Sequence, residues 1–376
     1  MTTRHLCAAA LFWIAAATSA GAQDAASAPL TEPAPSFADR MIEPALAGDE
    51  RDETLSARPA MFLQLRFSRA PMAGTDHESA DTNLQVTRTE LEWGGRLDRH
   101  FGVGLEFQFH PLLDGAPEEI VNDAFVEYYA TEHLTLRFGQ FIKPFGFDIQ
   151  RSSSTREYPE RAMFAGYFFP GQRDRGLLLR WRPEREGLLH HVDVDAAVLN
   201  GNRFWNDNDG RLDYVLRARK RLTRVPLALG VSTQIGSQIV PPGSDASTDV
   251  RLLGLDLQTA LGPVGLRTEW VHGTRPSTLL GLEPDYTAAF APHTTTTGLA
   301  AAVLVRVSDA AECYARLDHL AGDPVTGRTV RAVDAGYRRR VGASGAWGVS
   351  AQWKSAPTSN DDAVNTRVQT TFGVTF

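Results

Sequence analysis

The sequence has few cysteines and no long apolar segment, and these shortages exclude several classes of protein. Two cysteines, Cys7 and Cys313, occur among 376 residues. Cys7 lies in a segment that we expect to be removed, so Cys313 has no partner for a disulfide framework or a thiolate metal site. Beyond residue 22, no uncharged stretch reaches the roughly 20 apolar residues that a spanning helix needs. A membrane form of this chain therefore would not cross the bilayer with helices.

Basic residues are also fewer than acidic ones. The chain has 38 Lys and Arg against 45 Asp and Glu, a net charge of −7 at pH 7. This balance argues against nucleic acid as a partner.

Recognisable catalytic or metal-binding spacings are missing as well. Ser152, Ser153 and Ser154 have no base at a spacing typical of a nucleophilic enzyme. The adjacent His190 and His191 would face opposite ways on a strand, which disfavours joint metal binding. We therefore predict a protein that is not an enzyme and has no cofactor and no bound metal.

The amino-terminal residues indicate export. Arg4 and His5 precede an apolar run, and Ala20-Gly21-Ala22 supplies the small-x-small pattern of a signal-peptidase site. We expect residues 1–22 to be a signal peptide. Residues 23–58 are rich in Ala, Pro, Asp and Glu and have no sustained apolar period, so they are predicted to form a flexible periplasmic leader.

The carboxyl-terminal residues alternate strictly between apolar and polar side chains. Val368, Phe372, Val374 and Phe376 share one face, and Arg367, Gln369 and Thr371 share the other. This period of two predicts a strand with one apolar and one polar face. A terminal strand that ends on an aromatic residue resembles the signature of outer-membrane barrels that the barrel-assembly machinery recognises.

From residue 60 onward, similar segments of about ten residues recur, and none has the period of an amphipathic helix. The predicted strands are 60–69, 83–97, 101–110, 120–130, 133–142, 174–183, 189–200, 210–222, 225–236, 249–260, 263–273, 294–307, 310–320, 328–341, 345–355 and 364–376. Connections after even-numbered strands are short, and those after odd-numbered strands are mostly long. This alternation predicts an all-β, transmembrane antiparallel barrel of about 16 strands over residues 59–376, with apolar faces toward lipid and polar faces toward a water-filled lumen.

The connection from Lys143 to Arg173 is much longer than most others and carries seven aromatic residues. Long loops in compact folds are usually functional or disordered, and aromatic residues disfavour a loop loose in solvent. We therefore predict that this third loop folds into the lumen and narrows it. Residues 143–175 contain six basic and four acidic side chains, a positive balance within a negative protein.

Arginines also alternate along the predicted eighth strand, where Arg211, Arg217, Arg219 and Arg221 share the polar face. They are predicted to face the lumen, and four further arginines could join them: Arg66, Arg137, Arg180 and Arg182. Acids are expected on the same surface: Glu90, Glu92, Glu106, Glu127, Asp193 and Asp195. A mixed wall of this kind leaves open a channel with only mild selectivity.

The run Leu136-Arg-Phe-Gly-Gln-Phe-Ile-Lys-Pro-Phe-Gly-Phe-Asp148, followed by Arg151-Ser-Ser-Ser154 and Tyr158-Pro-Glu-Arg161, resembles the phosphate-selective porins O and P. The resemblance implies a trimeric barrel of sixteen strands in which an arginine ladder guides anions toward a lysine near the constriction. It suggests Lys143 for that lysine, with Arg151, Arg156 and Arg161 as loop arginines. Arg217 and Arg219 complete the predicted anion site.

The sequence therefore predicts a passive porin of the Gram-negative outer membrane, surrounded by lipid and lipopolysaccharide, that prefers small anions such as phosphate. Two alternatives stay open. In the first, the lumen acids dominate, and the channel is general or cation-preferring. In the second, the barrel has a structural or adhesive role, and the pore is incidental.

Overall fold

The computed structural model describes residues 60–69, 82–109, 120–169, 171–183, 191–202, 209–222, 225–239, 247–275, 294–321, 329–342, 345–355 and 364–375. The predicted signal peptide (1–22) and leader (23–58) lie outside these residues. Among the helices in the described ranges, none is long and apolar enough to span a membrane.

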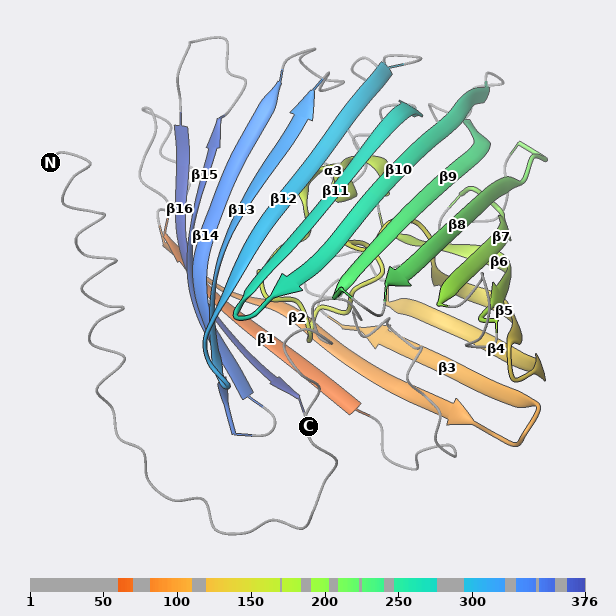
Figure 1. Cartoon of the computed structure of the whole chain (residues 1–376), viewed down its shortest axis with the longest axis horizontal. Coiled ribbons are helices and arrows are strands. Elements are labelled where there is room, and N and C mark those ends of the chain that lie inside the picture. Colours follow the sequence, from red (N-terminus) through yellow and green to blue (C-terminus); the bar gives the residue numbers. More distant parts are fainter. Residues whose placement is uncertain are drawn as a thin grey trace, which may run out of the picture. The chain divides into compact units, whose positions relative to one another are not determined.

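The described residues form a closed antiparallel barrel of sixteen strands (Figure 1). Each strand pairs with its neighbours in sequence, and β1 pairs with β16 to close the ring. The strands are β1 (Ala60–Arg69), β2 (Thr82–Arg96), β3 (Phe101–Gln108), β4 (Val121–Thr131), β5 (Leu134–Ile142), β6 (Arg173–Trp181), β7 (Val192–Leu199), β8 (Asp213–Leu222), β9 (Leu227–Ile239), β10 (Ser247–Leu261), β11 (Val264–Arg275), β12 (Thr294–Ser308), β13 (Ala311–Ala321), β14 (Val330–Val341), β15 (Gly345–Ser355) and β16 (Val364–Thr375). All sixteen predicted strands are confirmed, and the largest boundary differences are three residues, at the starts of β7 and β8 and the end of β9.

The two faces of each strand differ in polarity, as the alternation predicts. In β8, Tyr214 and Leu216 point outward and are 57% and 49% exposed, whereas Val215 and Arg217 point inward and are buried. Phe138 in β5 is 70% exposed, and its neighbour Arg137 is buried. Apolar side chains on the outside of a closed barrel suit lipid, because a soluble barrel would turn them inward.

One element was not predicted. A short helix, α3 (Met163–Phe168), lies within the connection from β5 to β6 and contacts β12 and β13. Phe164 and Phe168 are four residues apart, so both fall on the buried face of this helix. No helical period was recognised after residue 60, because six residues are too few to show one.

Candidate constriction and anion site

The loop segment, residues 143–172, is described except at position 170 and is closed at its base by a buried ion pair. Lys143 Nζ lies 2.9 Å from Asp174 Oδ2, and the two residues are 1% and 0% exposed. The backbone N–H of Lys143 also donates to the carbonyl oxygen of Gln172 at 2.9 Å. The segment therefore leaves β5 and enters β6 at adjacent points of the barrel wall.

The first arm of the loop segment, residues 146–148, contacts the inner face of β9 and β11. The N–H of Gly146 donates to Ser232 Oγ at 3.0 Å. The N–H groups of Phe147 and Asp148 donate to the same oxygen of Glu269, at 3.0 and 2.9 Å. These interactions hold the first arm against strands four and six positions away from β5 in the ring.

The second arm of the loop segment, residues 154–160, contacts strands β2, β13 and β14. Arg316 Nη1 in β13 donates to the carbonyl oxygen of Glu160 at 2.6 Å, and Arg88 Nη2 in β2 lies 3.3 Å from the Glu160 carboxylate. Arg338 Nη2 in β14 donates to the carbonyl oxygen of Ser154 at 3.1 Å. Because β13 is eight positions from β5 in a ring of sixteen, the segment reaches the inner face of the strand across the barrel.

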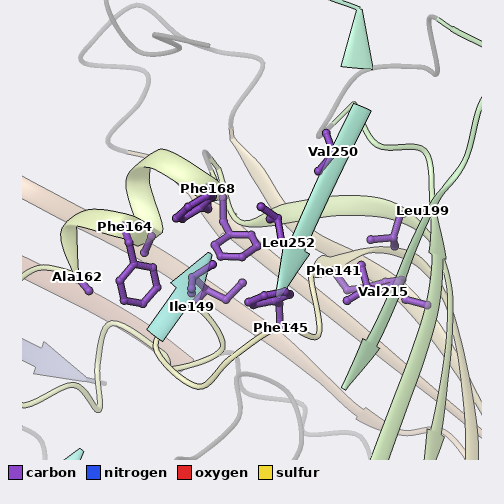
Figure 2. Close-up of a cluster of buried hydrophobic side chains, with 14 of the residues drawn as sticks. Phe141, Phe145, Ile149, Ala162, Phe164, Phe168, Leu199, Val215, Val250 and Leu252 are labelled. Carbon is purple, nitrogen blue, oxygen red and sulfur yellow. The ribbon is translucent and has the colours of Figure 1, made fainter. Parts of the chain in front are cut away.

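An apolar cluster fills the space between the loop segment and strands β5–β12. We call this part of the interior the sealed side. Figure 2 shows Phe141, Phe145, Ile149, Phe164 and Phe168 among side chains from the barrel wall. The wall contributes mainly aliphatic residues: Leu178, Leu199, Val215, Val250, Leu252 and Val271. The rings of Phe145 and Phe169 stand 4.7 Å apart. This packing resembles the core of a globular protein and excludes water from that side.

On the other side, which we call the open side, a cavity of about 260 Å³ separates residues 153–159 from the wall. Small inward-facing residues of β15 and β16 leave this space free: Gly348, Ser350, Thr371 and Gly373. Within the described residues, the cavity beside Gly146 and Phe147 on the sealed side is only about 10 Å³. That volume is near the minimum for a single water molecule.

The predicted anion-site residues are not all gathered at this cavity. Arg151 forms an ion pair with Glu157, and Arg161 donates to the carbonyl oxygen of Asp148. Arg217 Nη1 lies 2.7 Å from Asp256 Oδ2, and Arg219 Nη2 lies 3.0 Å from Asp193 Oδ2. Lys143 is engaged by Asp174. Arg211 precedes β8 and is exposed, so its predicted place on the inner face of that strand is wrong.

Arg156 differs from these residues because it lines the cavity and forms no ion pair within the described part of the chain. It is 4% exposed, and its Nε and Nη1 form no hydrogen bond among the described residues. Burial lowers the pKa of Arg156 well below its ordinary value, and the nearby Arg161 and Arg88 lower this pKa further. Asp148 raises this pKa, but burial and the neighbouring arginines outweigh its effect. A buried guanidinium with free donors favours an oxyanion ligand, which accepts those hydrogen bonds and neutralises the charge.

Two further arginines of the cavity, Arg338 and Arg340, were missed from the sequence. Both lie in β14, whose even-numbered residues face inward. The run Arg338-Arg339-Arg340 was the available signal, because alternate members of a run on a strand share one face. The run did not stand out because its position relative to the loop segment depends on the closure of the barrel.

The predicted lumen acids mostly have arginine partners. Glu106 lies 2.9 Å from Arg173, and Glu127 lies 2.6 Å from Arg137. Asp195 is 2.9 Å from Arg182. In the loop segment, burial would raise the pKa of Glu157, but Arg151 and Arg267 outweigh it and lower this pKa to about 2. Paired acids of this kind exert less attraction on a passing cation than isolated ones.

A closed barrel with an apolar outer surface, a polar inner surface and a loop segment bound to the inner wall defines an outer-membrane porin. Part of the sequence matches a family of such proteins: residues 63–222 match the model of the family described as "Phosphate-selective porin O and P". A comparison with curated proteins found no match.

Solved structures share the fold at low sequence identity. An anion-selective porin from Comamonas acidovorans has a TM-score of 0.62 and 10% identity, covering 86% of this chain and all of the porin. OmpF of Salmonella typhi, in complex with daunomycin, has a TM-score of 0.58 and 12% identity over 85% of this chain and 97% of its own. OmpT of Vibrio cholerae, in trimer form, has a TM-score of 0.56 and 11% identity over 86% of this chain and all of its own.

Proposed function

We propose that this porin is a passive channel that prefers small anions and binds phosphate-like oxyanions on the open side. The observation that carries the proposal is Arg156, a buried guanidinium with unpaired donors on the wall of the larger described cavity. A positive charge at a constriction with low-dielectric walls acts strongly on a passing ion. No energy source is involved, since selection depends on the bore and the local field.

The proposed conduction path follows from the asymmetry of the interior. The loop segment narrows the bore, the apolar cluster closes the sealed side, and solutes pass between residues 153–159 and β14–β16. Arg338 and Arg340 line the same path. We assign them to capturing anions beside Arg156, and we assign Lys143 to closing the base of the loop segment.

Two properties of related proteins support this reading. The family description names phosphate selectivity, and the porin from Comamonas acidovorans is described as anion-selective. The trimer form of the Vibrio cholerae protein supports a homotrimer for this chain. Outer-membrane lipid, lipopolysaccharide and the barrel-assembly machinery are the further partners expected of such a barrel.

The test is the reversal potential of single channels in planar bilayers under a potassium chloride gradient, with and without added phosphate. Wild-type channels should prefer chloride, and phosphate should reduce the chloride current. The Arg156→Glu variant should lose both the preference and the block. Arg251→Glu is the matched control, because Arg251 is an exposed outer residue and the same charge change there should alter neither property.

Either of two results would contradict the proposal. Cation preference in wild-type channels would favour the lumen acids as the selective element. Negligible conductance from correctly folded protein would favour a structural or adhesive barrel.

A further inference from the structure

The turn at Gly146 is bound to the barrel wall through its backbone. Three consecutive N–H groups, those of Gly146, Phe147 and Asp148, all donate to inward-facing side chains of β9 and β11. Glu269 receives two of them and is 1% exposed. Successive N–H groups that converge on one carboxylate oxygen form a small anion-binding concavity, here occupied by a side chain of the same chain.

Gly146 is required at this turn for two reasons. Its φ of +54° lies in the left-handed region, which residues with a side chain adopt at a cost. In addition, a Cβ atom at this position would lie 1.7 Å from Oε1 of Glu269. The turn and the carboxylate are therefore fitted to one another, although they are more than 120 residues apart in the chain.

We infer that Glu269 is a positioning residue that determines the bore by holding the first arm of the loop segment against β9 and β11. This inference rests on the proposed passive channel and adds the residue that keeps its sealed side shut. Glu269 does not need to touch the passing anion, because it acts through the placement of Gly146 and Phe147.

The surroundings of the turn show what its release would open. The cavity of about 10 Å³ beside Gly146 and Phe147 is lined by five charged wall residues: Arg182, Asp193, Asp195, Arg217 and Arg219. The three arginines in this lining face the two aspartates, and the ion pairs among them leave little net electric field in the cavity. Displacement of the turn would join this space to the lumen and create a second, weakly selective path.

The experiment measures single-channel conductance and anion preference for Glu269→Leu, Glu269→Gln and Gly146→Ala. Glu269→Leu removes the acceptor oxygen, and we expect conductance to rise on the order of twofold while anion preference falls. Gly146→Ala forces the turn away from the intact carboxylate and should produce the same change. Glu269→Gln retains an oxygen that accepts an N–H bond, so its conductance should stay closer to wild type.

Glu127→Gln is the matched control for the loss of one inward-facing carboxylate. Glu127 is bound by Arg137 and has no hydrogen bond to the loop segment among the described residues. Simple removal of negative charge would strengthen anion preference, whereas release of the turn weakens it, so the sign separates the two causes. Combining Gly146→Ala with Glu269→Leu should add little beyond either change, because both break the same contact.

Folding is checked by circular dichroism and by resistance of the barrel to unfolding in detergent at room temperature. Wild-type conductance and selectivity in a folded Glu269→Leu channel would overturn the inference. Gly146→Ala keeps the test open if Glu269→Leu does not fold, since its conductance should still exceed that of Glu127→Gln. Cation preference in the wild type would instead count against the proposed function, and the conductance ratios would still test Glu269.

Discussion

The two sides of the loop segment are built from the same polypeptide but in opposite ways. Toward β5–β12, aromatic rings of the segment pack against aliphatic wall residues and leave about 10 Å³ beside Gly146 and Phe147. Toward β14–β16, glycine, serine and threonine face the segment across about 260 Å³. We therefore propose that the small inward-facing side chains of β15 and β16 keep the bore open on that side.

The charges of the two sides differ as well. Arg217 and Arg219 face inward, as predicted, but each is neutralised by an aspartate. Arg156 lies on the cavity wall with two nitrogen atoms that donate to no group in the described residues. We therefore base the proposed anion site on the unpaired donors of Arg156 rather than on the number of arginines on a wall.

The largest effect should come from filling the open side. Thr371 faces the cavity from β16, so Thr371→Trp should reduce single-channel conductance about fivefold or more. Val368→Trp places the same ring on the outer, lipid-facing side of the same strand and should leave conductance unchanged. Equal conductances of the two variants in planar bilayers would show that the path lies elsewhere.

On the sealed side, a truncation should reduce stability more than it changes conductance. Phe168 is fully buried in the apolar cluster, and Phe168→Ala should lower the free energy of unfolding by about 4 kcal/mol. Urea unfolding in detergent micelles measures the loss, with Phe138→Ala on the outer face as the control. If Phe168→Ala changed conductance more than Thr371→Trp does, the assignment of the open and sealed sides would be reversed.

Lys143 should behave as a structural residue. Removing one partner of its buried pair, in Lys143→Met, should lower the free energy of unfolding by about 3 kcal/mol because Asp174 is left uncompensated. The double change Lys143→Met with Asp174→Leu should restore most of the stability. Block of chloride current by phosphate should persist in the folded double variant, and its loss would instead place Lys143 in the anion site.

The last expected effect concerns pH. Because Glu157 has a pKa of about 2, lowered from 4.5, its ionised form stabilises the loop segment at every pH above 4.5. This contribution is lost as the pH falls from 4.5 toward 2. Urea unfolding between pH 6 and pH 2 should therefore show a steeper loss of stability in the wild type than in Glu157→Gln. Parallel curves for the two proteins would contradict the pairing with Arg151 and Arg267.

The local sequence pattern was sufficient to predict most of the barrel. Alternation of apolar and polar residues defines each strand by itself, so all sixteen strands and their inward faces could be predicted, including Arg217 and Arg219. The short helix α3 could not be predicted in the same way. Its form depends on packing of Phe164 and Phe168 against β12 and β13, which are distant in sequence.

The site was harder to predict than the fold, because its ion pairs form between side chains that only the folded chain brings together. The sequence does not indicate that Asp174 neutralises Lys143 or that Glu157 neutralises Arg151. Arg156 was among the predicted residues, yet nothing in its sequence neighbourhood separates it from Arg151 and Arg161. Glu269 was not predicted at all, since its role depends on a turn more than 120 residues earlier in the chain.

Passage of solutes along the open side can be tested by blocking single cysteines with a charged thiol reagent during current recording. In a Cys313→Ser background, Thr371→Cys places a thiol on the open side and Ala197→Cys places one on the inner wall of the sealed side. The reagent should reduce the current through the Thr371→Cys channel and leave the Ala197→Cys channel unchanged. Block of Ala197→Cys with no effect on Thr371→Cys would show that solutes do not pass along the open side.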